Sequence, residues 1–340
     1  MTSNNLSMPW LDSGFEQVVS AHIHATLPHA LLVEGQLGLG KRLLAERIAK
    51  RILCASSHER AEACGECKQC KLFEAGSHSD YRALSPEEGS SVIKVDVIRS
   101  LVEFLSQSSL QGGYKVALIE PAEAMNVNAA NALLKTLEEP TPRTLIILVT
   151  HQPGAILATI RSRCQAIPVA VPSEDAAMDY LQGCSESIDE HDQLKSLLQL
   201  AAGSPCLAAD YIEQGALASS SEMLEQLAQV LKRQLSVSEV AEAWADDNAL
   251  TRMQWLVKWA SDLCSLSFAG REVSVPEGNA RKMLQYLADK CSATQLFGVY
   301  DYCLAQSSLL AGNTNPNKNL LFESVLNRWR DLMLKSAKTD

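Results

Sequence analysis

Four cysteines lie close together in the first third of the sequence, in the pattern C-x9-C-x2-C-x2-C. They are Cys54, Cys64, Cys67 and Cys70. Thiolates at such short spacings can surround one metal ion, and four sulfur ligands are a usual donor set of structural zinc. A closed set of four sulfurs leaves no open position for a substrate. The pattern therefore predicts a structural zinc module over residues 54–70.

An iron–sulfur cluster is the competing interpretation of these cysteines. The C-x2-C-x2-C spacing partly fits bacterial ferredoxins, but the cysteine–proline pair that follows in those proteins is missing here. The other six cysteines are scattered singly, which is typical of small buried apolar side chains. They are Cys164, Cys184, Cys206, Cys264, Cys291 and Cys303.

A glycine-rich segment that ends in lysine is the second candidate site. Gly35, Gly38, Gly40 and Lys41 fit the pattern G-x-x-x-x-G-K, between an apolar run and a helical pattern. In this context, backbone N–H groups at a helix N-terminus can surround a phosphate, and the lysine can reach its outer oxygens. The segment is therefore predicted to be a phosphate-binding loop.

The residues around this loop do not suit ATP hydrolysis. The position after Lys41 holds Arg42, where a hydrolytic loop needs Ser or Thr to hold magnesium. After the next long apolar run, Glu120 could contact a metal ion, but Pro121 stands where a second acid would polarise the attacking water. We therefore expect no intrinsic ATPase activity, whereas the sequence leaves nucleotide binding open.

Two arginines, Arg161 and Arg163, form the third candidate site. A solvated surface pair is the simpler interpretation of such a dibasic pattern. The alternative is an arginine at a subunit edge, which can enter a neighbour's active site and stabilise transition-state charge on phosphate.

The first 168 residues must position all three sites, and they alternate between strand and helix patterns. Short apolar runs predict buried strands, and amphipathic patterns between them predict helices. Strands of this kind are typical of a parallel sheet that helices cover on both faces. The expected strands are 30–34, 115–120 and 145–150, and the expected helices are 41–53, 128–137 and 156–161.

The second half of the chain is helical in pattern. Ser173 precedes two acidic residues and predicts a helix N-terminus. Breaks at 183–185 and 203–205 indicate a small helical unit, and the patterns over 221–235 and 253–266 predict an antiparallel bundle. An apolar stripe near the C-terminus suits either the core or a subunit interface. It consists of Leu320, Leu321, Val325, Leu326 and Trp329.

Composition and charge indicate a globular protein and argue against a membrane-spanning or secreted one. Hydrophobic residues make up 46% of the 340, as in globular proteins, and no apolar run is long enough for a membrane helix. The first residues have no secretory signal pattern, so we expect a cytoplasmic protein. Residues 1–168 carry 16 basic and 17 acidic side chains, whereas 169–340 carry 14 and 23. An acidic second half argues against a broad grip on a nucleic-acid backbone.

The sequence resembles the delta-prime subunits of bacterial DNA polymerase III clamp loaders, which are members of the AAA+ family. The resemblance covers essentially the whole chain. It rests on the four-cysteine insertion, on the run from Asn131 to Pro140 and on Ser162-Arg163-Cys164. An ATP-hydrolysing subunit would also carry an arginine where this chain has Cys206. With Arg42 and Pro121, this departure matches the non-hydrolysing members.

The resemblance implies a fold that is α/β plus all-α. Residues 1–170 would form a RecA-like AAA+ domain with the zinc-binding insertion, 171–212 a helical lid, and 213–340 a C-terminal helical collar. Arg163 would be an arginine finger that acts in trans, and the four cysteines would bind zinc.

The resemblance also implies partners. The chain would join motor subunits of the gamma/tau type and the delta subunit in a hetero-oligomeric ring. This ring loads the sliding clamp onto primed DNA, as part of a holoenzyme with DNA-directed DNA polymerase activity.

Two other functions stay open at this point. The first is an ATP-hydrolysing motor paralogue, which Arg42 opposes. The second is a zinc-dependent DNA-binding module, which the neutral first half and the acidic second half oppose.

Overall fold

The computed structural model describes residues 7–56, 61–87, 90–184, 191–269, 279–312 and 316–336. The chain forms two compact units. The first comprises Met1–Tyr180 with Ser204–Leu207, and the second comprises Leu181–Gly203 with Ala208–Asp340. The finer division into three domains stays a prediction.

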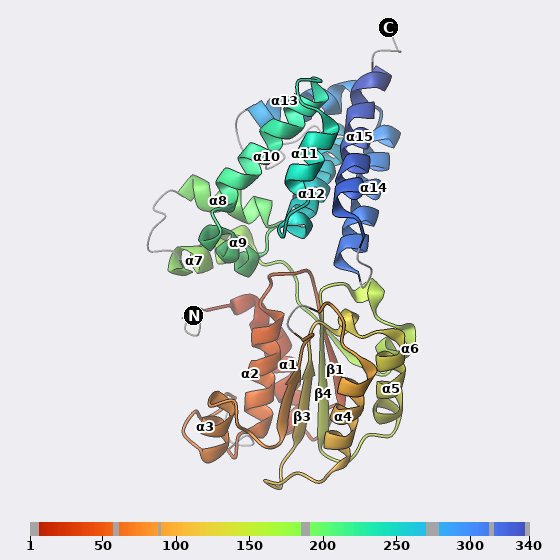
Figure 1. Ribbon diagram of the computed structural model, residues 1–340. Coiled ribbons are helices and arrows are strands. Elements are labelled where there is room, and N and C mark those ends of the chain that lie inside the picture. Colours follow the sequence, from red (N-terminus) through yellow and green to blue (C-terminus); the bar gives the residue numbers. More distant parts are fainter. Residues whose placement is uncertain are drawn as a thin grey trace. The chain divides into compact units, whose positions relative to one another are not determined.

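A five-stranded parallel sheet organises the first unit (Figure 1). Its strand order is β2-β3-β4-β1-β5. The long apolar runs became the three central strands, and every residue of β3 and β4 is buried. The strands are β1 (Ala30–Glu34), β2 (Tyr81–Leu84), β3 (Lys115–Ile119), β4 (Thr144–Thr150) and β5 (Gln165–Pro168).

Helices cover both faces of this sheet, and each face has its own core. Leu31 and Val33 of β1 pack into the core on the α1 and α2 side, whereas Ala30 and Leu32 pack into the core on the α4 and α5 side. This alternation follows from the two-residue period of a strand. The helices are α1 (Asp12–Ile23), α2 (Lys41–Leu53), α4 (Val95–Ser106) and α5 (Val127–Glu138).

Two strands were absent from the sequence-based expectation. Both β2 and β5 lie at the edges of the sheet and are four residues long. Most of their side chains are exposed or half-buried, so neither strand has an apolar run that marks it. The central strands and the helices after them agree with the expected ranges.

Parallel strands bring the phosphate loop and the residues that follow β3 and β4 to one edge of the sheet. The loops after β1, β3 and β4 all leave the carboxyl ends of neighbouring strands, where ligands bind in such sheets. Short helical segments follow in these connections: α3 (Lys68–Glu74) after α2, η2 (Ala122–Ala124) after β3, and η3 (Pro153–Ala155) and α6 (Ala158–Arg161) after β4. A further 3-10 turn, η1 (Pro9–Leu11), precedes α1.

The second unit consists of packed helices. Within it α12 packs along α14, and α11 packs against α15, where the rings of Trp244 and Phe322 meet edge to face at 5.8 Å. The helices are α8 (His191–Leu200), α10 (Ala216–Leu231), α11 (Val237–Trp244), α12 (Ala249–Ala269), α13 (Asn279–Lys290), α14 (Ala293–Ala311) and α15 (Lys318–Ser336). Two further helices, α7 (Glu174–Cys184) and α9 (Pro205–Glu213), have residues in both units.

The apolar stripe of α15 is mostly core. Val325, Leu326 and Trp329 are fully buried within the second unit, whereas Leu320 is 61% exposed. The start of α7 agrees with the sequence, because the Ser173 hydroxyl accepts a hydrogen bond from the Ala176 N–H at 3.3 Å.

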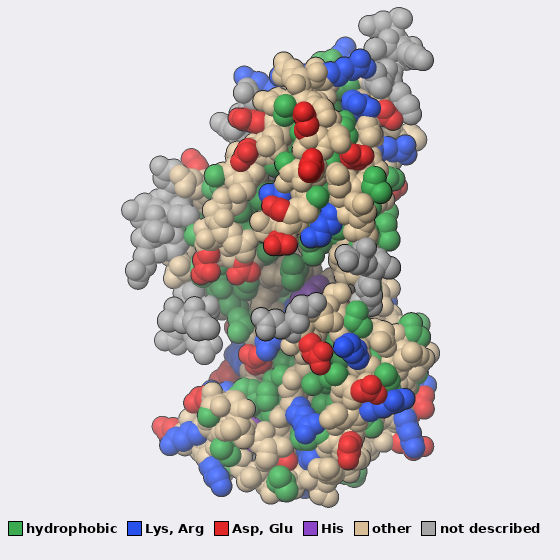
Figure 2. Space-filling view, in the orientation of Figure 1, with side chains coloured by type: hydrophobic (Ala, Val, Ile, Leu, Met, Phe, Trp, Pro, Cys, Tyr) green, Lys and Arg blue, Asp and Glu red, His purple; other side chains and the backbone are tan. Residues whose placement is uncertain are grey.

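Charged side chains are interspersed on the face of each unit that Figure 2 shows, with Lys and Arg among Asp and Glu. Among the described residues, no helix has both the length and the apolar composition needed to cross a membrane.

Candidate functional site

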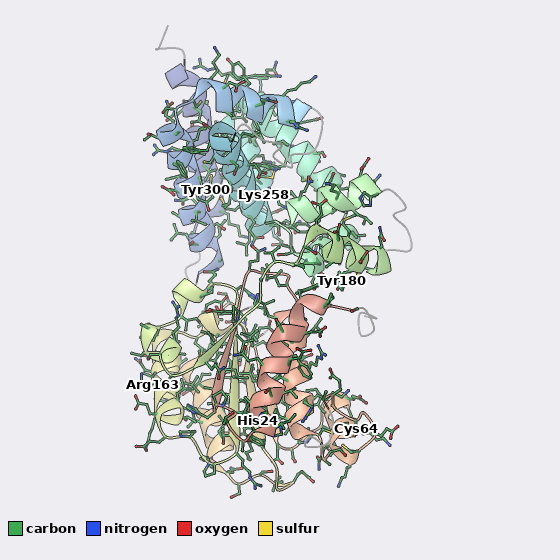
Figure 3. All side chains as sticks on the ribbon, turned by 180° about the vertical axis from the view of Figure 1, so that it is seen from behind. His24, Cys64, Arg163, Tyr180, Lys258 and Tyr300 are labelled. Atoms are coloured by element: carbon green, nitrogen blue, oxygen red, sulfur yellow. The ribbon has the colours of Figure 1, made fainter. Side chains whose placement is uncertain are left out.

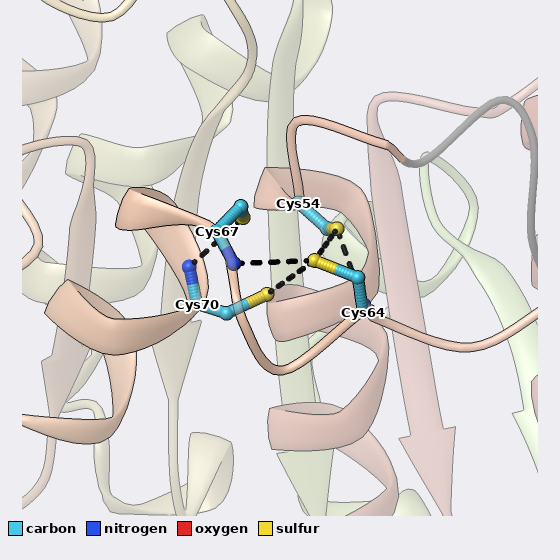
Figure 4. Close-up of side chains that lie close together, drawn as sticks. All are labelled: Cys54, Cys64, Cys67 and Cys70. Carbon is cyan, nitrogen blue, oxygen red and sulfur yellow. Dashed lines mark hydrogen bonds between the residues drawn. The ribbon is translucent and has the colours of Figure 1, made fainter.

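The four cysteines converge beside α2 (Figure 4). Their sulfur atoms all lie within 4.8 Å of one another. The Cys64 sulfur is 3.5 Å from that of Cys54 and 3.9 Å from that of Cys70. Four sulfurs at about 2.3 Å from a zinc ion would form a tetrahedron with edges of about 3.8 Å. The donor set and its spacing therefore fit one tetrahedral ion.

Local structure supplies this geometry. Cys54 directly follows the last turn of α2, while Cys67 is the N-cap of α3 and Cys70 lies in its first turn. Three backbone N–H groups donate to the sulfurs at 3.4 Å: Cys64 to Cys54, Cys67 to Cys64 and Cys70 to Cys67. Hydrogen bonds of this kind stabilise thiolates, the form that binds metal.

Acid–base properties differ within the cluster. The N–H groups of Cys67 and Glu66 lower the pKa of Cys64. Burial acts to raise the pKa of Cys67, but backbone N–H groups outweigh it and the pKa falls to about 6. Burial raises the pKa of Cys70 to about 12. A buried thiol of this kind gives up its proton readily only to a bound cation, which is what a metal site provides.

The glycine-rich segment connects β1 to α2 as a phosphate-loop motif requires. Gly38 has a φ of +79°, and a side-chain Cβ there would lie 2.4 Å from the Cβ of Leu207. A Cβ at Gly35 would lie 2.5 Å from the Val169 carbonyl oxygen. Only glycine fits these two positions without a shift of the backbone.

The loop is covered by other parts of the first unit. The Cys206 N–H donates to the Gly38 carbonyl at 3.0 Å, which brings the start of α9 onto the loop. From the N-terminal side, the indole N–H of Trp10 donates to the Leu39 carbonyl at 2.9 Å. Gly40, the last glycine of the loop, lies between Met8 and Cys206.

Lys41 is turned into the loop and is 2% exposed. Its amine donates to the Gln36 carbonyl within the loop itself. Burial lowers the pKa of Lys41 to about 8, although the carboxylates of Glu120 and Glu123 oppose this shift. The predicted phosphate ligand is therefore in place and already bonded to a carbonyl oxygen.

Arg42 and Glu120, which the sequence treated separately, form an ion pair. The Arg42 guanidinium lies 3.1 Å from the Glu120 carboxylate and 2.9 Å from that of Glu46. Burial raises the pKa of Glu120, and Arg42 opposes this shift. The arginine thus supplies the positive charge that a magnesium ion supplies beside such an acid in hydrolytic loops.

Two residues at this edge were missed by sequence reasoning. The His151 N–H donates to the Glu123 carboxylate at 2.9 Å, and His151 directly follows β4. Burial and the nearby Lys41 lower the pKa of His151 to about 4. The end of a buried strand was the available signal for His151, whereas nothing in the sequence marks Glu123.

Arg163 lies apart from the phosphate loop. Its guanidinium pairs with Glu138 of α5 at 2.7 Å and donates to the Thr159 carbonyl at 2.9 Å. Figure 3 shows Arg163 and Cys64 on opposite sides of the first unit. The three candidate sites therefore occupy three places on one unit, and the arginine faces outward on its own side.

Comparison with known proteins identifies relatives over both units. The family model "DNA polymerase III, delta subunit" matches residues 12–173, and "DNA polymerase III, delta subunit, C terminal" matches 214–331. DNA polymerase III subunit delta' of Pseudomonas aeruginosa is 38% identical over 95% of this chain and 97% of its own length.

Two further matches agree in coverage. The delta' subunit of Escherichia coli is 32% identical over 94% of both chains. The crystal structure of a DNA polymerase III gamma subunit-related protein from Thermotoga maritima covers 94% of this chain and 99% of its own, at 19% identity and a TM-score of 0.43. On the sequence matches, the chain belongs to the DNA polymerase III subunit delta' family.

Proposed function

We propose that this chain is the non-hydrolysing member of a clamp loader, which assembles with motor subunits of the gamma/tau type and a delta subunit. In this ring it helps to load the sliding clamp onto primed DNA in the cytoplasm. Membership of the delta' family supports the assembly, and the state of the phosphate loop supports the absence of hydrolysis. The expected domain roles follow: an AAA+ domain over 1–170, a lid over 171–212 and a collar over 213–340.

The observation that carries the proposal is the Arg42–Glu120 ion pair at 3.1 Å. A magnesium ion beside Glu120 would have to displace a guanidinium of the same sign. Lys41 is bonded to Gln36, and the start of α9 lies on Gly38. The Lys41 amine and the Glu120 carboxylate, which a magnesium–nucleotide complex would engage, are therefore already occupied.

ATP turnover tests this part of the proposal. The isolated chain should show none above background, and Arg42→Thr should not restore it, because Pro121 still leaves the attacking water without a base. Robust turnover by the wild-type chain would favour the alternative, an ATP-hydrolysing motor paralogue. Turnover by Arg42→Thr alone would contradict the role given to Pro121.

For the cysteine cluster, we propose one structural zinc ion held by Cys54, Cys64, Cys67 and Cys70. The sulfur spacing and the three N–H donors support it. When bound, zinc would link the end of α2 to the start of α3 without an open coordination position. Metal analysis of protein purified without chelators should find zinc, and iron with visible absorbance would contradict the assignment.

For Arg163, we propose the trans role that the family resemblance implies. Its guanidinium pairs with Glu138 in this chain, and the pair is only partly buried, with side-chain exposures of 35% and 50%. Exposed ion pairs contribute little stability. The phosphates of a nucleotide in a neighbouring subunit could therefore replace Glu138 at small cost, because they carry more negative charge and can also accept two hydrogen bonds from one guanidinium.

A further inference from the structure

A fully buried arginine, Arg51, lies in the last turn of α2 just before the cysteine cluster. Its side chain is 0% exposed. Its Nε–H donates to the Ala61 carbonyl at 2.8 Å. Among the described residues, neither of its two terminal nitrogens has a hydrogen-bond partner, although both are buried.

This burial needs an explanation. Arginine stays protonated in proteins, so Arg51 carries a full positive charge in the interior. Buried charges are ordinarily paired, because an unpaired one loses its hydration without replacement. The charge of Glu62 acts on Arg51, but this carboxylate is 54% exposed and already bound by Arg47.

The cysteine cluster, with zinc bound, would carry an excess of negative charge. Four thiolates around one divalent ion leave two negative charges in excess. Cys54 follows Arg51 by three residues, a spacing that places two side chains on the same side of a helix end. Burial lowers the pKa of Arg51, and the charge of the Cys54 thiolate opposes that shift.

We propose that Arg51 is the charge-compensating residue of the metal site: its buried guanidinium neutralises part of the excess negative charge of the four thiolates and so raises their affinity for zinc. Its Nε–H also holds the Ala61 carbonyl, three residues before Cys64. Arg51 acts through the ligands and does not touch the ion. The inference rests on the zinc site proposed above.

The zinc affinities of two Arg51 variants distinguish the effect of its charge from the effect of its hydrogen bond to Ala61. The protein is stripped of metal under reducing conditions, and its affinity for zinc ions is measured by competition with a chromophoric chelator. Arg51→Gln keeps an N–H donor for Ala61 and loses the charge, whereas Arg51→Lys keeps the charge and loses the planar fork. We expect Arg51→Gln to weaken zinc binding by about 10–100-fold, the usual effect of residues behind the ligands. Arg51→Lys should retain most of the affinity.

Lys71→Met is the matched control. It also removes one positive charge beside a ligand, but Lys71 is exposed, so water already screens it. Its zinc affinity should equal that of the wild type. Equal affinity of Arg51→Gln and wild type would overturn the proposal, as would a loss in Arg51→Lys as large as in Arg51→Gln.

Thermal unfolding with and without zinc gives the second measurement. A positive charge at the end of α2 also suits the helix dipole, and on that account a substitution would cost the same with and without metal. Charge compensation predicts a larger loss in the zinc-bound protein than in the stripped protein. A wild-type chain that binds no zinc would instead contradict the zinc site itself.

Discussion

At the scale of single residues, the guanidinium groups of Arg42 and Arg163 have opposite uses. The guanidinium of Arg42 forms ion pairs with Glu120 and Glu46, two carboxylates of its own unit. Arg163 pairs with the partly exposed carboxylate of Glu138 and donates to the Thr159 carbonyl and the Ser162 hydroxyl, and none of these contacts is buried. On the function proposed above, Arg42 closes this chain's own site, and Arg163 would be available to a neighbouring subunit.

Arg163→Ala should leave zinc content and complex assembly intact but reduce the DNA-stimulated ATP hydrolysis of the assembled complex. Arginine fingers contribute about 10³–10⁵ in rate in GTPase systems. A ring with several active sites should lose only part of its total turnover, because one site is affected. Steady-state ATPase and clamp-loading assays on the reconstituted complex measure this.

Two further variants serve as comparisons for Arg163→Ala. Arg163→Lys should rescue poorly, since lysine keeps the charge but loses the bidentate fork. Arg161→Ala is the neighbouring control and should have a milder effect. Normal ATP hydrolysis and loading by a stoichiometric Arg163→Ala complex would leave the chain with a structural role only.

The sequence marks candidate site residues most clearly where a motif is contiguous. The cysteine set and the loop from Gly35 to Lys41 lie within short segments, and spacing alone identified them. The Arg42–Glu120 pair joins residues 78 positions apart, and the contact of Glu123 with His151 spans 28. Such contacts depend on strand order and register, which no local pattern contains.

At the scale of elements, the central strands and their helices follow from apolar periodicity. The strand expected at 30–34 and the helix expected at 41–53 have the same bounds in the structure. The edge strands β2 and β5 could not be predicted in this way, because only one side of each is hydrogen-bonded and most of their side chains reach solvent.

Gly38→Ala should destabilise the first unit through the contact of the loop with α9. The positive φ alone costs about 1–3 kcal/mol for a residue with a side chain, and the collision with Leu207 adds to it. Gly154→Ala is the control, since nothing lies within 4 Å of a Cβ there. Chemical denaturation should show a lower midpoint for Gly38→Ala only. Equal midpoints for the two variants would mean that the start of α9 does not hold this position in solution.

At the scale of the whole molecule, the first unit combines a sheet with two cores and a module that has little core of its own. Among the described residues of the module over 54–70, Cys54 and Cys70 are buried, while Cys64 and Cys67 are only half-buried. A segment with so few buried side chains needs cross-links to hold a fixed shape.

Removal of zinc should therefore unfold the module before the sheet. Cys67→Ser should release the metal and lower the unfolding temperature of the first unit, because metal binding contributes folding free energy. The helical second unit should keep its stability. Metal analysis and calorimetry measure the two effects, and Cys184→Ser, at an exposed position outside the cluster, is the control. Full retention of zinc by Cys67→Ser would contradict the ligand assignment.

The hydrogen bond from the Trp10 indole to the Leu39 carbonyl makes tryptophan fluorescence a reporter of the phosphate loop. The chain has five tryptophans, and Trp10 alone lies in the first unit. Its indole ring also meets Tyr180 edge to face at 5.6 Å. Indole emission shifts in wavelength when its N–H exchanges a carbonyl oxygen for water. Replacement of the other four tryptophans by phenylalanine would leave Trp10 as the single indole fluorophore. Its emission wavelength would then report whether its N–H is bonded to the loop carbonyl or to water.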